Sequence, residues 1–359
     1  MLRHSKQSGR RSRRRLFLGL FALLAIQLTA IEINAQTAGT PVSQPVLEPK
    51  TQSFIDAVSS QGGKPLYTLS SSDARKVLED AQSGEIVKAP AAIEDRRFPV
   101  GPTGEVSVRI YRPVGVKGPL PVVMYFHGGG WVLGSVNTHD RLVRDLVSQT
   151  KAAFVFVKYT NSPEAQFPVP IEQAYAATKY VAEHAKELGF DSSRLAVAGD
   201  SVGGNMAAAV TLLAKEHNGP TIVYQVLFYP VTDANFDNGS YTEFANGPWL
   251  TKPAMEWFWD AYAPNKEDRK KPAVSPLLAT TDQLKGLPPA LVITDENDVL
   301  RDEGEAYARK LIQAGVDVTA VRYLATFHDF VMLNGLADTP AAKSAIRLAS
   351  EKLTTALNR

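Results

Sequence analysis

Ser201 lies at the centre of a short glycine-containing segment, Gly199-Asp200-Ser201-Val202-Gly203. An apolar run over 195–198 precedes this segment, and a run of small residues over 204–209 follows it. The pattern predicts a short strand, a tight turn and a helix, with the serine hydroxyl exposed at the apex of the turn. Ser201 is therefore a candidate nucleophile for acyl transfer.

A second glycine-rich segment, from His127 to Trp131, closes the apolar run 121–126. Consecutive glycines permit positive φ and leave backbone N–H groups unhindered, so these groups can stabilise an oxygen that becomes negative. A phosphate-binding loop is the alternative, but a following Lys-Ser/Thr pair and G-x-G-x-x-G spacing are missing. An ordinary tight turn does not need three glycines. The predicted oxyanion hole comprises Gly128, Gly129, Gly130 and Val202.

His328 is the best candidate for the general base among the six histidines of the chain. His4 belongs to the N-terminal segment and His127 to the glycine loop, and His139 begins a helical pattern. His184 and His217 lie near the ends of helical patterns, where solvated or capping roles are expected. His328 alone follows a late strand pattern on a loop, although a structural role there is the alternative.

Three acids lie between the strand pattern 290–294 and the helical pattern 305–313. Asp295, Asp298 and Asp302 are each candidates to orient the imidazole. Asp295 is expected to end the strand, and Asp302 to open the helix, where the helix dipole favours an acid. Asp298, on the loop between them, is preferred. The order serine, acid, histidine is that of α/β-hydrolases.

With these residues, the chain from about Phe98 onward resembles the hormone-sensitive-lipase-like branch of α/β-hydrolases, which includes many bacterial carboxylesterases. The segments that carry the resemblance are 127–131, 159–168, 199–204, 298–304 and 328–330. The resemblance implies Ser201 as nucleophile, His328 as base and Asp298 as orienting acid. It also implies an oxyanion hole formed by N–H groups of 128–130 and Val202.

Three positions depart from the family pattern. Val202 replaces the usual Ala, Val299 the usual Pro, and Asp329 the common Gly after the histidine. None of these changes removes a catalytic group, although the larger Val202 could narrow the acyl site. Receptor relatives of this fold lack the catalytic histidine, so the presence of His328 argues against a purely receptor role.

Strand and helix patterns alternate after Phe98, which predicts a mostly parallel sheet covered on both faces. The predicted strands are 106–111, 122–126, 154–159, 195–198, 222–229, 290–294 and 318–323. The predicted helices are 141–149, 171–188 and 203–216. With the resemblance, the fold class is α/β, an α/β-hydrolase fold with a helical cap.

Three regions are predicted along the chain. Residues 1–35 form an export signal, residues 36–95 a linker with N-terminal cap helices, and residues 96–359 the catalytic domain with a cap insertion at about 233–284. The linker covers about 36–50, and Ser72 is expected to cap a helix ending near Gln82. Aromatic residues of the insertion line the acyl pocket or only pack the cap. The pocket candidates are Trp131, Trp249 and Trp257.

Residues 1–35 combine an arginine cluster with the apolar stretch 16–31, which is short for a membrane span. Arg14 and Arg15 resemble a twin-arginine signal, so a periplasmic or secreted location is expected. An uncleaved anchor is the alternative to cleavage after Ala35. Removing seven basic and one acidic residue with this segment leaves 32 basic and 36 acidic residues, a net charge of −4. The basic balance therefore reflects targeting and not nucleic-acid binding.

The sequence predicts a serine carboxylesterase that hydrolyses short-chain, acetyl-type esters through an acyl-enzyme. No cofactor or metal is expected, since zinc-finger and H-E-x-x-H spacings are missing, and the absence of cysteine excludes disulfides and a catalytic thiol. An arylacylamide hydrolase or a lipase would use the same residues, and a non-catalytic ligand-binding protein is a further alternative. The expected partner is a small-molecule ester; stable membrane insertion is not expected after signal cleavage, and a homodimer is compatible with the sequence.

Overall fold

The computed structural model describes residues 45–358, and the predicted export signal 1–35 lies outside them. Within this range eight strands form one sheet in the order β1-β2-β4-β3-β5-β6-β7-β8. The strands are β1 Ala91–Phe98, β2 Val106–Pro113, β3 Leu120–Phe126, β4 Ala153–Lys158, β5 Phe190–Asp200, β6 Tyr224–Phe228, β7 Ala290–Asn297 and β8 Val318–Phe327. The pairs β1–β2 and β2–β4 are antiparallel and the other five are parallel, which confirms the predicted sheet.

Helices connect most of these strands. They are α1 Pro49–Ser60, α2 Ser71–Gln82, α3 Asp140–Thr150, α4 Val169–Glu183, α5 Ala185–Leu188, α6 Val202–Glu216, α7 Gly239–Glu243, α8 Lys252–Tyr262, α9 Thr281–Leu284, α10 Arg301–Gln313 and α11 Pro340–Leu357. Short 3₁₀ turns lie at Leu66–Thr68, Asp268–Lys270, Pro276–Leu278 and Asn334–Leu336. Among the described residues, we find no helix with the length and apolar character needed to cross a bilayer.

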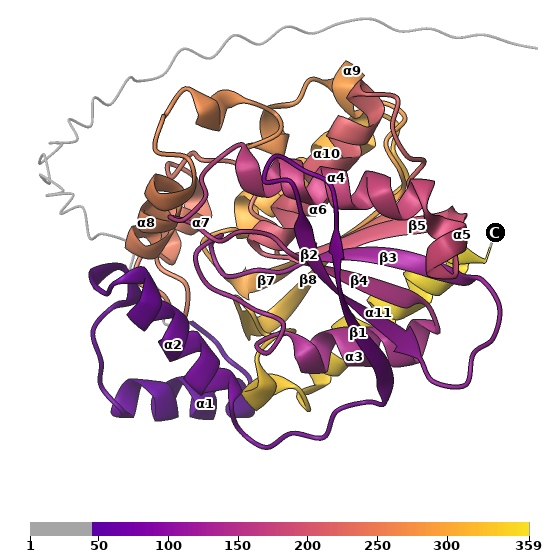
Figure 1. Cartoon of the computed structure of the whole chain (residues 1–359). Coiled ribbons are helices and arrows are strands. Elements are labelled where there is room, and N and C mark those ends of the chain that lie inside the picture. Colours follow the sequence, from indigo (N-terminus) through magenta and orange to yellow (C-terminus); the bar gives the residue numbers. More distant parts are fainter. Residues whose placement is uncertain (1–44, 359) are drawn as a thin grey trace, which may run out of the picture. The chain divides into compact units, whose positions relative to one another are not determined.

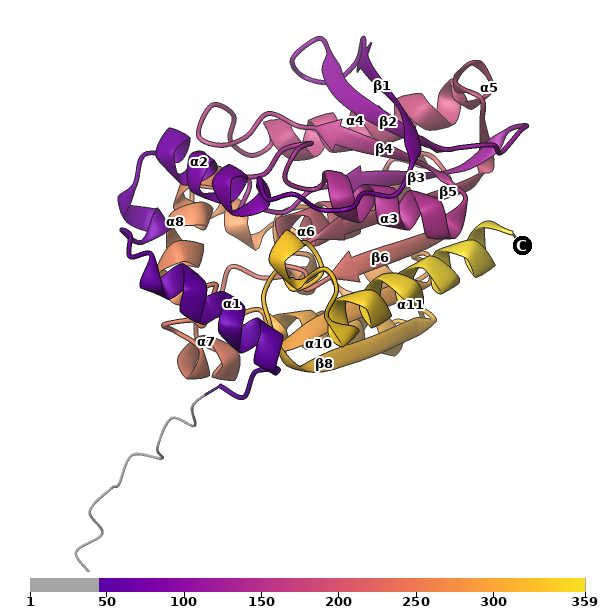
Figure 2. The same cartoon turned by 90° about the horizontal axis from the view of Figure 1, so that it is seen from below.

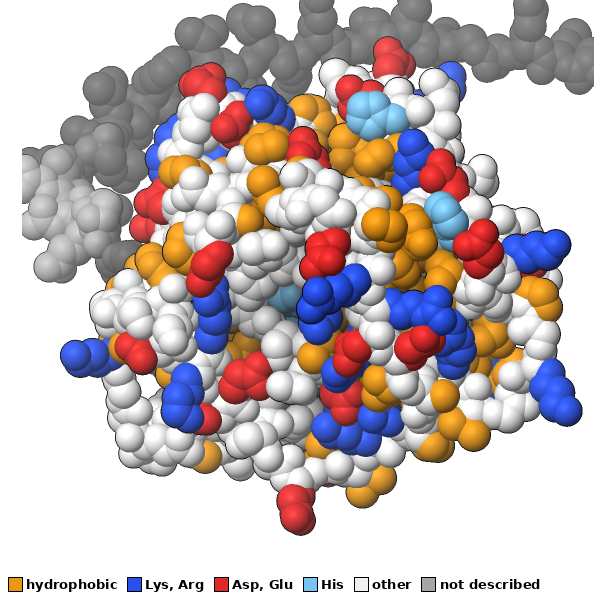
Figure 3. All heavy atoms as spheres, viewed as in Figure 1, with side chains coloured by type: hydrophobic (Ala, Val, Ile, Leu, Met, Phe, Trp, Pro, Cys, Tyr) orange, Lys and Arg blue, Asp and Glu red, His pale blue; other side chains and the backbone are white. Residues whose placement is uncertain are grey.

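The sheet is the middle layer of three (Figure 1). Helices α3 and α11 cover one face, and α4, α6 and α10 cover the other. The central strand β3 is apolar along its length, and residues 122–126 are fully buried. A strand that is buried on both faces does not alternate polar and apolar residues, which explains why β3 appears in the sequence as a continuous apolar run. Figure 3 shows acidic and basic side chains interspersed over the face that it draws.

Helices α1 and α2 lie at the same end of the molecule as α7 and α8 (Figure 2). The insertion between β6 and β7 contributes α7 and α8. Arg75 ties α2 to the body of the protein, because its guanidinium donates to the carbonyls of Val132 at 2.7 Å and Ser162 at 2.9 Å. It also pairs with Glu164 at 2.6 Å. Helix α2 is thus anchored to the loops that follow β3 and β4.

Some element boundaries differ from the predictions. Strand β1 was missed because its charged residues 94–97 resemble a loop, whereas an edge strand pairs on one side only and leaves such residues in solvent. Ser70, and not Ser72, caps α2 by accepting from the N–H of Asp73. The predicted helix 171–188 is divided at His184 into α4 and α5. Helix α1 begins at Pro49, inside the predicted linker.

Gly203 marks the closest approach of α6 to the sheet, because a Cβ there would lie 2.0 Å from the carbonyl oxygen of Phe126. We expect Gly203→Ala to destabilise the protein by about 3 kcal/mol, since α6 would have to move away from β3. Urea unfolding measures this loss. The control is Gly84→Ala, where a Cβ would meet nothing within 4 Å. Equal unfolding midpoints for the two variants would contradict the packing argument.

Candidate active site

Ser201 occupies a sharp turn between β5 and α6. Its backbone has φ 55° and ψ −121°, a conformation that L-residues rarely adopt and that costs free energy. The N–H of Ser201 donates to Phe228 at 2.9 Å, and its carbonyl accepts the first bond of α6, from Asn205 at 3.1 Å. A Cβ at Gly199 would lie 2.2 Å from the carbonyl oxygen of Gly203. The two glycines of the motif therefore permit the close packing that holds Ser201 in this turn.

The structure brings Ser201, His328 and Asp298 into one hydrogen-bonded chain. His328 Nε2 lies 2.9 Å from Ser201 Oγ, and His328 Nδ1 lies 2.8 Å from Asp298 Oδ2. The second carboxylate oxygen of Asp298 accepts from the N–H of Leu300 at 3.0 Å. All three side chains are buried. They follow or end the parallel strands β5, β7 and β8, whose carboxyl ends share one edge of the sheet.

The other two acids have different surroundings. Asp302 accepts from the N–H of Ser240 at 2.8 Å and from Arg301 at 2.9 Å, so it stabilises the start of α7. Asp295 is fully buried within β7, and neither of its oxygens has a hydrogen-bond partner among the described residues. Burial, followed by the charge of Asp298, raises the pKa of Asp295 well above its ordinary value. Burial and the neighbouring charge therefore both disfavour the ionised form of Asp295.

Asp295, Asp298 and His328 also form a group that could be considered for a metal, because their potential ligand atoms lie within 4.8 Å of one another. However, the Nδ1 atom of His328 and the Oδ2 atom of Asp298 are hydrogen-bonded to each other. Burial and the charge of Asp298 also disfavour a negative charge on Asp295, the remaining ligand candidate. This chemistry suits a histidine held by one carboxylate better than a metal site.

The glycine loop lies directly against Ser201. Gly129 and Gly130 have φ of 104° and 63°, and the carbonyl of Gly129 accepts from Val132 and Leu133 to close a turn. Gly129 and Gly130 line the same cavity as Ser201. Val202 is the first residue of α6, so its N–H precedes the first intrahelical bond. Gly129 and Gly130 thus border the cavity, and Val202 follows Ser201 at the start of α6.

Gly128 has a packing function within this loop. It is not among the residues that line the cavity, and its carbonyl accepts from His127 Nδ1 at 2.8 Å. A Cβ at Gly128 would lie 2.4 Å from Asp200 Oδ2. The first glycine thus lets the loop pack against Asp200, whereas the next two border the cavity.

A buried ion pair beneath the loop was missed by sequence reasoning. Asp200 accepts from the hydroxyl of Tyr125 at 2.6 Å, and its other oxygen lies 3.1 Å from His139 Nε2. Burial disfavours both charges, but their attraction outweighs it, so the pKa of His139 is raised and that of Asp200 is lowered. The sequence pattern around His139 predicts only the start of a helix. The signal that could have revealed the pair is an acid inside the nucleophile segment, which needs a partner once buried.

A cavity of about 700 Å³ opens over Ser201 and His328 between α1, α2 and α8. Trp249 lines this cavity, as predicted, but Trp131 and Trp257 do not. Trp131 is fully buried and stacks on Tyr262 with 4.0 Å between ring centroids. Trp257 is half-buried beside Phe258. Both tryptophans contribute to the packing of the cap helix α8. This is the alternative to lining the acyl pocket that the sequence left open.

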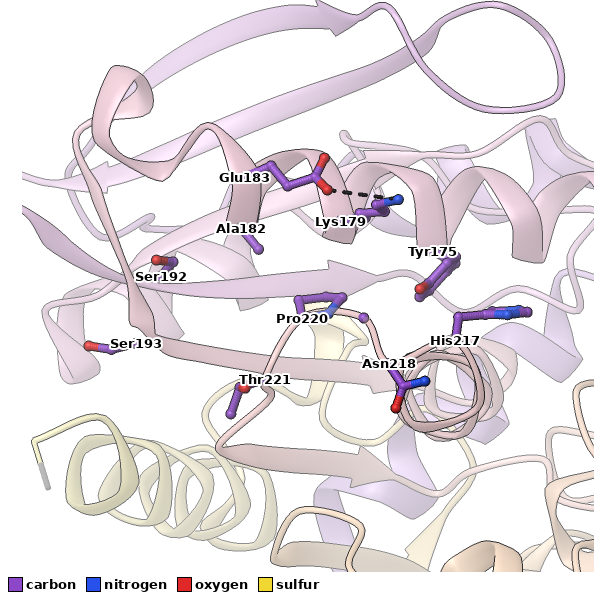
Figure 4. A pocket seen from close by; sticks show the side chains of 11 residues that line it. Tyr175, Lys179, Ala182, Glu183, Ser192, Ser193, His217, Asn218, Pro220 and Thr221 are labelled. Carbon is purple, nitrogen blue, oxygen red and sulfur yellow. Dashed lines mark ion pairs between the residues drawn. The ribbon is translucent and has the colours of Figure 1, made fainter.

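A second depression, of about 1040 Å³, lies between α4, the start of β5 and the loop after α6 (Figure 4). Its labelled residues include Tyr175, Lys179 and His217, and a dashed line marks the ion pair of Lys179 with Glu183. The depression lies at the amino ends of the strands, away from the edge that carries Ser201. It contains no residue predicted for the catalytic site.

Comparison with known proteins decides the family. A protein-family sequence model described as α/β-hydrolase fold matches residues 123–332. The chain belongs to the hormone-sensitive-lipase-like branch of the α/β-hydrolases. It is 36% identical to the carboxylesterase NlhH of Mycobacterium tuberculosis over 86% of this chain and 94% of that protein. It is 34% identical to an ethyl acetate hydrolase of Pseudomonas putida, over 81% and 93% of the two chains.

Solved structures agree with this family. A thermostable esterase from Pseudomonas putida is 52% identical and superimposes with a TM-score of 0.86, covering 88% of this chain and 98% of that one. The chain is therefore a carboxylic ester hydrolase.

The charge state of His328 in this hydrolase is set by neighbouring carboxylates. Burial opposes a charged imidazole, but Asp298 and then Asp329 attract the proton more strongly, which raises the pKa of His328 from 6.5 to about 9. Asp329 Oδ1 lies 3.6 Å from His328 Nε2. The neutral imidazole that a general base requires is thus the minor form at pH 7.

We expect kcat/KM for ester hydrolysis to rise with pH, because the base becomes available only as His328 loses its proton. The rising limb should be displaced upward from 6.5 towards about 9. Initial rates measured below KM between pH 5 and 10 give this limb, with circular dichroism at each pH as the control for folding. A limb centred at or below pH 6.5 would show that the carboxylates do not hold the proton on His328.

Proposed function

We propose that this protein is a serine carboxylesterase that hydrolyses short-chain, acetyl-type esters through a Ser201-His328-Asp298 triad. The observation that carries the proposal is the continuous chain of contacts, 2.9 Å from Ser201 Oγ to His328 Nε2 and 2.8 Å from His328 Nδ1 to Asp298 Oδ2. The chain ends at an apolar cavity large enough for a small ester.

In the proposed mechanism, Ser201 Oγ attacks the ester carbonyl while its proton passes to His328 Nε2. The carbonyl oxygen becomes negative and accepts from the N–H groups of Gly129, Gly130 and Val202. His328 then gives the proton to the departing alcohol, which leaves an acyl group on Ser201. Water attacks this acyl-enzyme, loses its proton to His328, and releases the carboxylic acid. Asp298 keeps Nδ1 protonated throughout.

The preference for short acyl groups has two supports. Val202, next to the nucleophile in the chain, is larger than the usual Ala; it is fully buried and does not line the cavity, so it would narrow the acyl site only through its packing. One relative is named for ethyl acetate, an ester with a two-carbon acyl group.

We also propose that residues 1–35 direct export. The mass of the protein recovered from the periplasm, which shows whether the chain starts at Gln36 or at Met1, tests cleavage.

Replacement of the nucleophile tests the proposed function directly. We expect Ser201→Ala to lower kcat on p-nitrophenyl acetate by about 10⁴-fold or more, because the acyl-enzyme cannot form. Ser192→Ala, an exposed serine in the second depression, is the matched control and should retain wild-type turnover. Wild-type-like turnover by a folded Ser201→Ala protein would refute the mechanism. A wild-type protein inactive on every p-nitrophenyl ester from acetate to palmitate would refute the esterase proposal.

Mutation can distinguish the expected pocket role of Trp249 from the packing role of Trp257. Trp249→Ala should enlarge the cavity and shift the best p-nitrophenyl ester from acetate or butyrate towards longer acyl chains, because Trp249 lines the cavity. Trp257→Ala should leave the chain-length profile unchanged, since this side chain packs outside it. The profile of kcat/KM against acyl length decides, and identical profiles for the two variants would exclude a role for Trp249 in selecting the acyl group.

A further inference from the structure

Asp329 is a half-buried acid beside the reacting atoms, its Oδ1 atom is buried, and the proposed mechanism does not use it. It lines the same cavity as Ser201 and His328. Its backbone has φ 71°, in the left-handed region, where the family commonly has Gly. The chain thus carries an acidic side chain at a position where glycine would be less strained. Burial raises the pKa of Asp329, and the charge of His328 opposes this shift.

The two oxygens of Asp329 differ in their contacts. Oδ2 accepts from the indole N–H of Trp249 at 3.1 Å. Oδ1 is buried and has no hydrogen-bond partner among the described residues, and it lies 3.6 Å from His328 Nε2. A buried carboxylate oxygen without a donor is costly, and a ligand that supplies a positive charge would offset the cost.

Among the described residues, no lysine or arginine pairs with Asp329 in the cavity. Its other charged lining residues in the described part of the chain, Lys64 and Asp73, are exposed. The nearby carboxylates Asp200 and Asp298 already pair with His139 and His328. His328 must be neutral to accept the serine proton, and it then no longer balances Asp329.

The position of Oδ1 indicates which part of a bound substrate lies nearest to the carboxylate of Asp329. His328 Nε2 delivers its proton to the oxygen of the departing alcohol, so a group 3.6 Å from Nε2 adjoins the alcohol side of the ester. We propose that Asp329 is a specificity-determining residue that favours esters whose alcohol part carries a positively charged nitrogen near the ester oxygen. This inference rests on the proposed serine esterase function.

Two acetates of equal shape test the inference. The substrates are 2-(trimethylammonio)ethyl acetate and 3,3-dimethylbutyl acetate, which share the acyl group and differ in one charge. We expect the wild-type protein to prefer the cation by about tenfold in kcat/KM, and Asp329→Asn to bring the ratio close to 1. The ratio isolates the charge effect, because any change in the proton affinity of His328 alters both rates alike.

Asp73→Asn is the matched control, because it neutralises an exposed carboxylate of the same cavity and should keep the wild-type ratio. Asparagine tolerates positive φ, so Asp329→Asn should fold, and thermal unfolding checks this. Hydrolysis of both acetates by the wild-type protein at equal rates would overturn the inference and leave the esterase proposal intact. A preference that persists in Asp329→Asn would also overturn it. Hydrolysis of neither ester by the wild-type protein would instead refute the proposed function and this inference with it.

Discussion

The close approach of helix α6 to the end of strand β3 is the constraint on which the site depends. A side chain at Gly203 would overlap the carbonyl of Phe126, and one at Gly199 would overlap Gly203. Without side chains there, the start of α6 packs against the end of β3 and the glycine loop, and its first N–H groups have no intrahelical partner. The turn that joins β5 to α6 must then be sharp, which forces Ser201 to positive φ. The strain is held by the packing of the central sheet around it.

Paired charges form the second layer of this arrangement. An ionised group in the interior is costly unless a partner and hydrogen bonds compensate for lost water. Asp200 meets that requirement with His139 and Tyr125, and Asp298 meets it with His328 and the N–H of Leu300. Asp295 has no such partner among the described residues, and burial raises its pKa well above the ordinary value. The acids near Ser201 therefore differ in their partners, and Asp329, which lines the cavity, has one oxygen without a hydrogen-bond partner among the described residues.

Local patterns made much of the fold and the catalytic chain predictable. The central strand β3 is an unbroken apolar run. Ser201, Asp298 and His328 follow β5, β7 and β8, so their convergence follows from the parallel sheet. What the sequence could not supply depends on contacts between distant residues. The charged edge strand β1 forms because β2 offers it a partner, and His139 meets Asp200 only through the fold. Likewise, Trp131 and Trp257 have the composition of pocket residues but pack α8, which only their three-dimensional neighbours reveal.

The central claim is that Ser201 forms a covalent acyl intermediate, and trapping that intermediate tests it most directly. The protein is mixed with p-nitrophenyl acetate, quenched in acid within milliseconds, and digested for peptide mass mapping. We predict one acetyl group per active chain, on the peptide that contains Ser201, with its formation matching the burst of p-nitrophenol. Turnover with no acetylated peptide, or with the acetyl group on another residue, would contradict the proposed role of Ser201.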